Sequence, residues 1–115
     1  MKIRKFDIMK KHAELCRILG HPSRLMIMEL LETKEESVSG IAESIGASIS
    51  TTSQHLRLLR DNNVVVARRE GQTIYYSLKH PELLVACRLI RKVLLEDMIS
   101  SGEVAESVGP GSRFI

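Results

Sequence analysis

The sequence predicts a mainly α-helical fold that carries one small β-hairpin, and three observations support this. Five segments carry apolar residues at helical spacing. Two segments rich in β-branched residues, 64–69 and 72–78, flank a short turn and predict a hairpin. Pro22 and Pro81 stand where helices are expected to begin, since proline at the first helical position leaves no backbone hydrogen bond unmade.

The first three helices are expected within residues 6–45. The first has apolar residues on one face and ends at Gly20; these residues are Phe6, Met9, Ala13, Cys16 and Leu19. The second begins at Pro22 and is apolar over much of its surface, so it is expected at the centre of the core. A charged connection, 33–36, leads to a short third helix capped by Ser37 and ended by Gly46.

A fourth helix is expected over residues 48–60, with Ser48 as its N-cap. One side of this helix is expected to be buried, and comprises Ile49, Thr52, Leu56 and Leu59. The opposite side is polar, with His55 at its margin, and comprises Ser50, Thr51, Gln54 and Arg57. With the preceding short helix and turn, residues 37–60 predict a helix-turn-helix whose polar side offers hydrogen bonds to base edges.

The hairpin carries Arg68, Arg69 and Gln72 around its turn. A helix-turn-helix followed by a basic hairpin is the layout of a winged helix, in which the hairpin lies beside a DNA groove. Because side chains alternate across a strand, at most one of the two arginines is expected to point fully into a groove.

The last helix is expected to begin at Pro81 and to carry a long apolar stripe. It follows a core that is already complete, so this helix and the first one are expected to bury their stripes against a second copy of the chain. The expected interface residues are Phe6, Met9, Ala13, Cys16, Leu83, Cys87, Ile90 and Leu94. Residues 1–99 are thus expected to form one DNA-binding and dimerisation domain, with a C-terminal tail at 100–115.

Composition narrows the function classes. Aromatic residues make up only 3% of the chain, which argues against single-stranded nucleic acid as a partner because such sites need stacking platforms. No segment approaches the ~20 apolar residues needed to cross a bilayer, and the basic start lacks the apolar run of a secretion signal. Cytoplasm is therefore expected, and two cysteines are compatible with a reducing compartment.

Three strings in this order resemble the ArsR/SmtB family of bacterial winged-helix repressors. They are Leu19–Leu25 (LGHPSRL), Ser50–Leu59 (STTSQHLRLL) and Arg68–Leu78 (RREGQTIYYSL), and the resemblance spans roughly residues 11–96. It implies a homodimeric repressor that binds a palindromic operator and is released by an effector. The contacts it implies are Ser50, Thr51, Gln54 and His55 on bases or phosphates, and Arg68, Arg69 and Gln72 from the wing.

The chain departs from that family's known metal sites. Where many members have paired cysteines and an acidic residue, this chain has Ser37, Ser39 and Gly40, and a hydroxyl is a poor ligand for a soft metal. The positions of the second family site are His80, Glu82, Val93 and Glu96, and valine breaks the ligand set. No metal or other cofactor is therefore expected.

Several roles stay open for the two cysteines. Cys16 and Cys87 fit buried small apolar residues, a thiol pair that senses oxidants or reactive sulfur, or soft-metal ligands together with His12. No Gly-rich phosphate loop, nucleophile elbow or carboxylate pair bracketed by pocket signals is present, so catalysis is not expected. The alternative to a DNA-binding repressor is a winged helix that binds a protein and has lost its DNA affinity.

Overall fold

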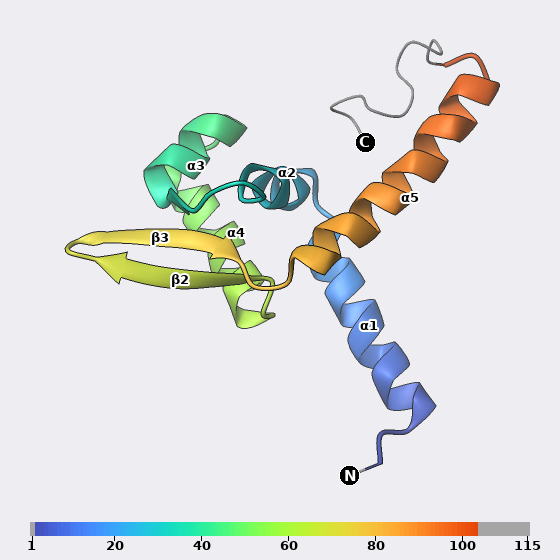
Figure 1. Ribbon diagram of the computed structural model, residues 1–115, viewed down its shortest axis with the longest axis horizontal. Coiled ribbons are helices and arrows are strands. Elements are labelled where there is room, and N and C mark those ends of the chain that lie inside the picture. Colours follow the sequence, from blue (N-terminus) through green and yellow to red (C-terminus); the bar gives the residue numbers. More distant parts are fainter. Residues whose placement is uncertain (1, 104–115) are drawn as a thin grey trace. The chain divides into compact units, whose positions relative to one another are not determined.

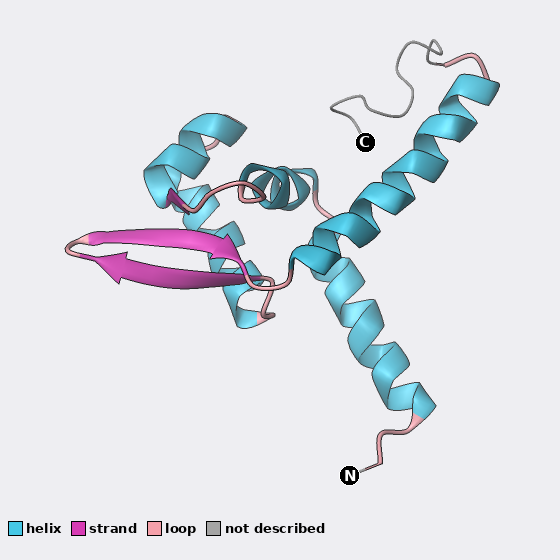
Figure 2. Cartoon of the chain, in the orientation of Figure 1, coloured by secondary structure: helices cyan, strands magenta, loops and turns pink. Residues whose placement is uncertain are grey.

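The computed structural model describes residues 2–103 and has the predicted fold, five helices with a small antiparallel sheet (Figures 1 and 2). The elements are α1 (Lys5–Leu19), α2 (Pro22–Leu30), β1 (Glu36–Ser37), α3 (Val38–Ile45), α4 (Ile49–Asp61), β2 (Val65–Glu70), β3 (Thr73–Leu78) and α5 (Pro81–Ser100). Of the expected tail, 100–115, all residues from 104 onward lie outside the described part.

The chain divides into two compact units, residues 1–80 and 81–115. The first unit contains every element from α1 to β3, and the second contains α5. Within residues 2–103, no helix combines the length and apolar character that crossing a membrane requires.

The predicted helix ends are confirmed by their local hydrogen bonds. Pro22 occupies the first turn of α2, whose N-cap is His21. The hydroxyl of Ser37 accepts a hydrogen bond from the Gly40 amide, and that of Ser48 accepts one from the Thr51 amide at 3.0 Å. Such caps satisfy backbone amides that have no partner within the helix. They fix where α3 and α4 begin.

The tight turn between α3 and α4 depends on Gly46. Its φ of +70° is left-handed, a conformation that glycine adopts without the clash that a Cβ would cause. The Gly46 and Ala47 amides bond back to carbonyls of α3, as at many helix C-termini. This turn sets the angle at which α4 leaves α3.

The core of the first unit lies where α2, α3 and α4 pack on one another and on the sheet. Its buried apolar residues are Ile27, Met28, Leu31, Ile41, Ala42, Leu56, Leu59, Val64, Val65 and Tyr76. α1 belongs to the same unit but extends away from this group (Figure 1), and none of its residues is buried. The core therefore holds α4 firmly and leaves α1 largely uncovered.

The sheet has the strand order β1-β3-β2 and is antiparallel throughout. The hairpin β2–β3 is the predicted wing, and Gly71 in its turn has a φ of +62°. Glu36 was expected to end a charged connection, and this expectation is wrong: Glu36 and Ser37 form β1 and pair with Tyr76 and Tyr75, while Ser37 also caps α3 as predicted. Two paired residues are too short to produce an alternating pattern in the sequence.

Candidate nucleic-acid interface

The two sides of α4 differ sharply in exposure. Thr52, Leu56 and Leu59 are fully buried, as predicted. Four of the exposed polar side chains on the remaining surface form what we call the polar face of α4: Ser50, Thr51, Gln54 and Arg57. Hydroxyl, amide and guanidinium groups at helical spacing can hydrogen-bond to base edges and phosphates in a major groove.

His55 does not belong to this face, so the expectation that it contacts DNA is corrected. Its side chain is only 8% exposed, and its Nδ1 accepts a hydrogen bond from Nε of Arg24 at 3.2 Å. Burial lowers the pKa of His55, with smaller contributions from charge interactions with His21 and Arg24, in that order. A buried, neutral imidazole with a partner inside the protein braces the helix and is not available to DNA.

Ile49 also differs from expectation, because it is 58% exposed where burial was predicted. It is the first residue of α4, and it borders an open hollow of about 330 Å³ between the starts of α3, α4 and β3. The hollow is lined by Ser37, Val38, Ser39, Ile49, Gln72, Thr73 and Ile74. The wing turn and the start of α4 thus border one shared concave surface.

On the wing, the two arginines have different surroundings. Arg69 is exposed, and among the described residues its side chain bonds only to the carbonyl of Gly71, at 3.2 Å, in its own turn. Gln72, in the same turn, is also exposed. The charge of Arg69 therefore has no carboxylate partner within residues 2–103, and it is available to an anion such as a DNA phosphate.

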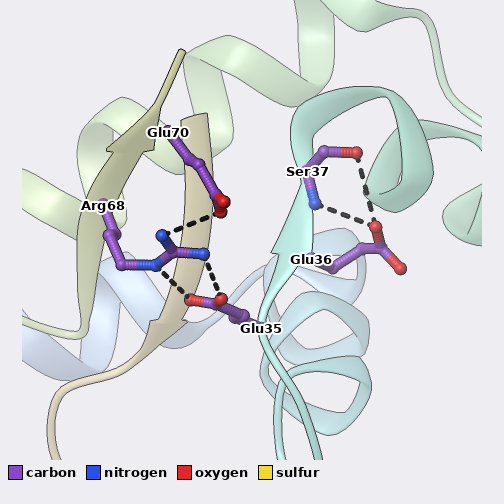
Figure 3. A network of polar contacts seen from close by, with 5 residues as sticks. All are labelled: Glu35, Glu36, Ser37, Arg68 and Glu70. Carbon is purple, nitrogen blue, oxygen red and sulfur yellow. Dashed lines mark hydrogen bonds and ion pairs between the residues drawn. The ribbon is translucent and has the colours of Figure 1, made fainter. Parts of the chain in front are cut away.

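Arg68, by contrast, is held by two carboxylates (Figure 3). Its Nε donates to Glu35 at 3.1 Å and a second nitrogen bonds the other Glu35 oxygen, while a third bonds Glu70 at 3.0 Å. The guanidinium also lies 5.1 Å from the ring centre of Tyr75, its cross-strand neighbour. The hydrogen bonds from Arg68 lower the pKa of Glu35, and those to Glu35 and Glu70 raise the pKa of Arg68.

This bidentate pair ties the wing to the loop before α3, 33 residues away in sequence. Sequence reasoning missed Glu35, because nothing local to that loop indicates a partner on the hairpin.

Sequence reasoning also missed the reason for a glycine at position 40. A Cβ at Gly40 would lie 2.3 Å from the Glu36 carboxylate, which bonds the amide and hydroxyl of Ser37 (Figure 3).

The expected interface residues on α1 are exposed. Phe6 is 72% and Met9 51% exposed, and Ala13 and Cys16 are exposed as well. On α5, considered by itself, Ile90 and Leu94 are exposed, Leu83 is half-buried and Cys87 is buried. Monomeric proteins rarely expose a helix with this many large apolar side chains, so both helices offer surfaces suited to a protein partner.

The two cysteines are free thiols in different environments, Cys16 exposed and Cys87 buried. Within residues 2–103, no three His, Cys, Asp or Glu side chains gather in a way that could hold a metal ion.

Comparison with known proteins places this geometry among characterised folds. The model of bacterial regulatory proteins of the arsR family matches residues 21–66, from the start of α2 to the beginning of the wing. An HTH-type transcriptional regulator of Mycobacterium tuberculosis, Rv0081, is 36% identical over 103 residues, which cover 89% of this chain and 90% of that protein.

Solved structures agree. The crystal structure of Rv0081 superimposes with a TM-score of 0.73 at 35% identity, covering 82% of this chain and 95% of that one. A homodimeric winged helix-turn-helix DNA-binding domain from Mycobacterium bovis, Mb0332, gives a TM-score of 0.75 at 29% identity, with coverages of 87% and 93%.

Proposed function

The chain belongs to the ArsR family of bacterial regulatory proteins, and from this premise we propose that two copies of it form a repressor that binds a palindromic operator. It is a DNA-binding transcriptional regulator of the winged helix-turn-helix kind. The proposal concerns how it binds: α4 enters the major groove with its polar face, and the wing lies along the DNA backbone.

The observation that carries this proposal is the polar face of α4. Its four side chains are exposed, while the opposite side of the helix is anchored in the core by Thr52, Leu56 and Leu59. A helix held rigidly in this way can present Ser50 and Gln54 to base edges without first having to become ordered. Arg57, further along the same face, suits a phosphate or a guanine.

Arg69 and Gln72 are the wing residues that we assign to DNA contact, because both are exposed beside the turn. Arg68 receives a different role, since two carboxylates already neutralise it. It ties the wing to the loop before α3.

Dimerisation through α1 and α5 follows from their exposed apolar side chains. α1 has no buried residue, and its large apolar side chains are well exposed: Phe6 exposes most of its surface and Met9 about half. On α5, Ile90 and Leu94 repeat at four-residue spacing, the arrangement of a helix that packs on another helix. A two-fold dimer makes the operator palindromic, with half-sites about 34 Å apart on one side of the duplex.

On this proposal residues 1–99 act as one DNA-binding and dimerisation domain. The domain works in the cytoplasm, where the operator is, and it has no catalytic activity.

An effector releases the dimer from DNA. Of the two thiols, Cys16 is exposed in the single chain and lies on the surface assigned to the dimer, whereas Cys87 is buried, so oxidation of Cys16 would act on the dimer contact itself. Operator titrations with and without oxidant, on the wild type and on Cys16→Ser, decide whether this thiol is the sensor: equal responses exclude it.

Replacing Gln54 with Ala tests the proposed reading of bases. The variant should lose about 1–3 kcal/mol of discrimination between operator and random DNA per half-site, or about 5- to 150-fold. Ser44→Ala, an exposed polar residue on α3, is the control and should behave as the wild type. Equal losses on both DNAs would contradict the base-reading role, and a wild type that binds no DNA would favour the protein-interaction alternative.

A further inference from the structure

A polar cluster joins three helices on the inward side of α4. Arg24, on α2, donates from Nε to Nδ1 of His55 at 3.2 Å and from a terminal nitrogen to the carbonyl of Ile18 at 2.9 Å. The rings of His21 and His55 lie 4.6 Å apart, tilted by 57°. We call Ile18, His21, Arg24 and His55 the Arg24 cluster; all four belong to the first compact unit.

Each of the two rings accepts a hydrogen bond at Nδ1. His55 accepts at Nδ1, so it is neutral and carries its proton on Nε2. His21 accepts at Nδ1 from the amide of Ser23, as the N-cap of α2. Arg24 is therefore the only donor in the cluster that reaches both α1 and α4, and its planar guanidinium serves the two acceptors at once.

The cluster lies at the point where α1 meets the rest of its unit. Ile18 is in the last turn of α1, where carbonyls have no partner within the helix. The amide of His21 also bonds back to the Leu19 carbonyl at 2.8 Å. Since no residue of α1 is buried, these bonds at its C-terminal end have an unusually large share in fixing its direction.

At the other end of the cluster, His55 directly follows Gln54 on the polar face. A change in the Arg24–His55 hydrogen bond thus acts one residue away from a side chain assigned to base contact. Arg24 spans the distance from a proposed dimerisation helix to the proposed DNA-reading helix through two hydrogen bonds.

We infer that Arg24 is a positioning residue that fixes the direction of α1 relative to α4 and so sets the separation of the two reading helices in the dimer. This inference rests on the proposed function. A small tilt of α1 gives a large displacement. The 15 residues of α1 span about 22 Å, so a tilt of ~10° at the cluster moves the N-terminal end of α1 by about 4 Å. That displacement is close to the ~3.4 Å rise of one base pair.

Operators with altered half-site spacing test this role. Affinity is measured by fluorescence anisotropy on the operator and on versions with one base pair inserted or removed at its centre. The wild type should lose about tenfold in affinity on the altered operators, because only one α4 then meets its bases in register. Arg24→Lys keeps the charge but has no planar fork, so its spacing penalty should fall to about twofold.

Two substitutions at His55 form a matched pair. The amide oxygen of His55→Asn lies near the position of Nδ1 and can accept the bond from Arg24, whereas the amide of His55→Gln reaches the position of Nε2. The Asn variant should retain the wild-type spacing preference and the Gln variant should lose it. This pair decides the matter even if Arg24→Lys fails to fold.

Thermal unfolding and dimer dissociation are measured for every variant. Variants that unfold earlier but keep the wild-type spacing preference would overturn the inference, since Arg24 would then only stabilise the fold. Equal behaviour of the Asn and Gln variants at His55 would overturn it too. If the wild type does not distinguish operator from random DNA at all, the proposed function itself fails, a result separate from either of these.

Discussion

Replacing Arg69 with Ala is expected to flatten the salt dependence of DNA binding, whereas replacing Arg68 should leave it nearly unchanged. Both substitutions remove one positive charge from the same strand of the wing. Only Arg69 is free of carboxylate partners among the described residues, because Arg68 is paired with Glu35 and Glu70. Arg68→Ala is therefore a charge-matched control for Arg69→Ala.

The expected magnitude follows from counterion release. Each phosphate contact contributes about 0.9 to the slope of log affinity against log salt, so two copies of Arg69 in a dimer contribute about 1.8. Between 50 and 200 mM salt, the wild type should then lose about 12-fold more affinity than Arg69→Ala does. Arg68→Ala should lose its affinity along the wild-type slope.

Fluorescence anisotropy with a labelled operator at four or more salt concentrations measures both slopes. The reasoning is refuted if Arg69→Ala keeps the wild-type slope, or if Arg68→Ala flattens it more. In the second case DNA would draw Arg68 away from Glu35, and the ion pair would hold the wing only in the absence of DNA.

Three further predictions concern stability. Thr52→Val should stabilise the protein by about 1 kcal/mol and raise Tm by about 4 °C. The reason is that the fully buried Thr52 hydroxyl has no hydrogen-bond partner within residues 2–103. A lower Tm would mean that the hydroxyl has such a partner. The free energy of unfolding should fall as the pH drops below 6.5, the pKa of an unfolded histidine. Burial, His21 and Arg24 lower the pKa of His55 in the folded protein, so the unfolded chain takes up this proton first. Melting at several pH values should show a smaller fall for His55→Asn, and an identical fall would exclude His55 as its source. Gly40→Ala should raise helix stability by about 1 kcal/mol in a Glu36→Ala background and by less in the wild type, where the new Cβ displaces the Glu36 carboxylate. Denaturant unfolding of the wild type, the two single variants and the double variant measures the difference. Equal gains in the two backgrounds would contradict the contact.

Local signals explain what the sequence could predict. Ser37 and Ser48 each cap an amide three residues ahead, so helix starts are encoded within one turn. The apolar spacing of Thr52, Leu56 and Leu59 identified the inward side of α4, and the turn at Gly71 identified the wing. These features depend on neighbours in the chain, which a single sequence displays.

The failures concern contacts between distant segments. Helical spacing placed His55 at the margin of the polar face, and its burial depends on Arg24, 31 residues earlier. Ile49 has the right spacing for the core but lies at the exposed first turn, where it borders the hollow beside the wing. The pairing of Glu35 with Arg68 spans 33 residues. In each case the partner is known only once the chain has folded.

Selection of binding sites from a pool of random duplex DNA by the purified protein tests the central claim most directly. If two α4 helices read bases in adjacent major grooves, the selected sequences should contain a palindrome whose half-site centres lie about 10–10.5 base pairs apart, or a multiple of this. Gln54→Ala should select a weaker motif at the corresponding positions of both half-sites. A pool that remains random after selection, or a single unpaired half-site, would contradict the account.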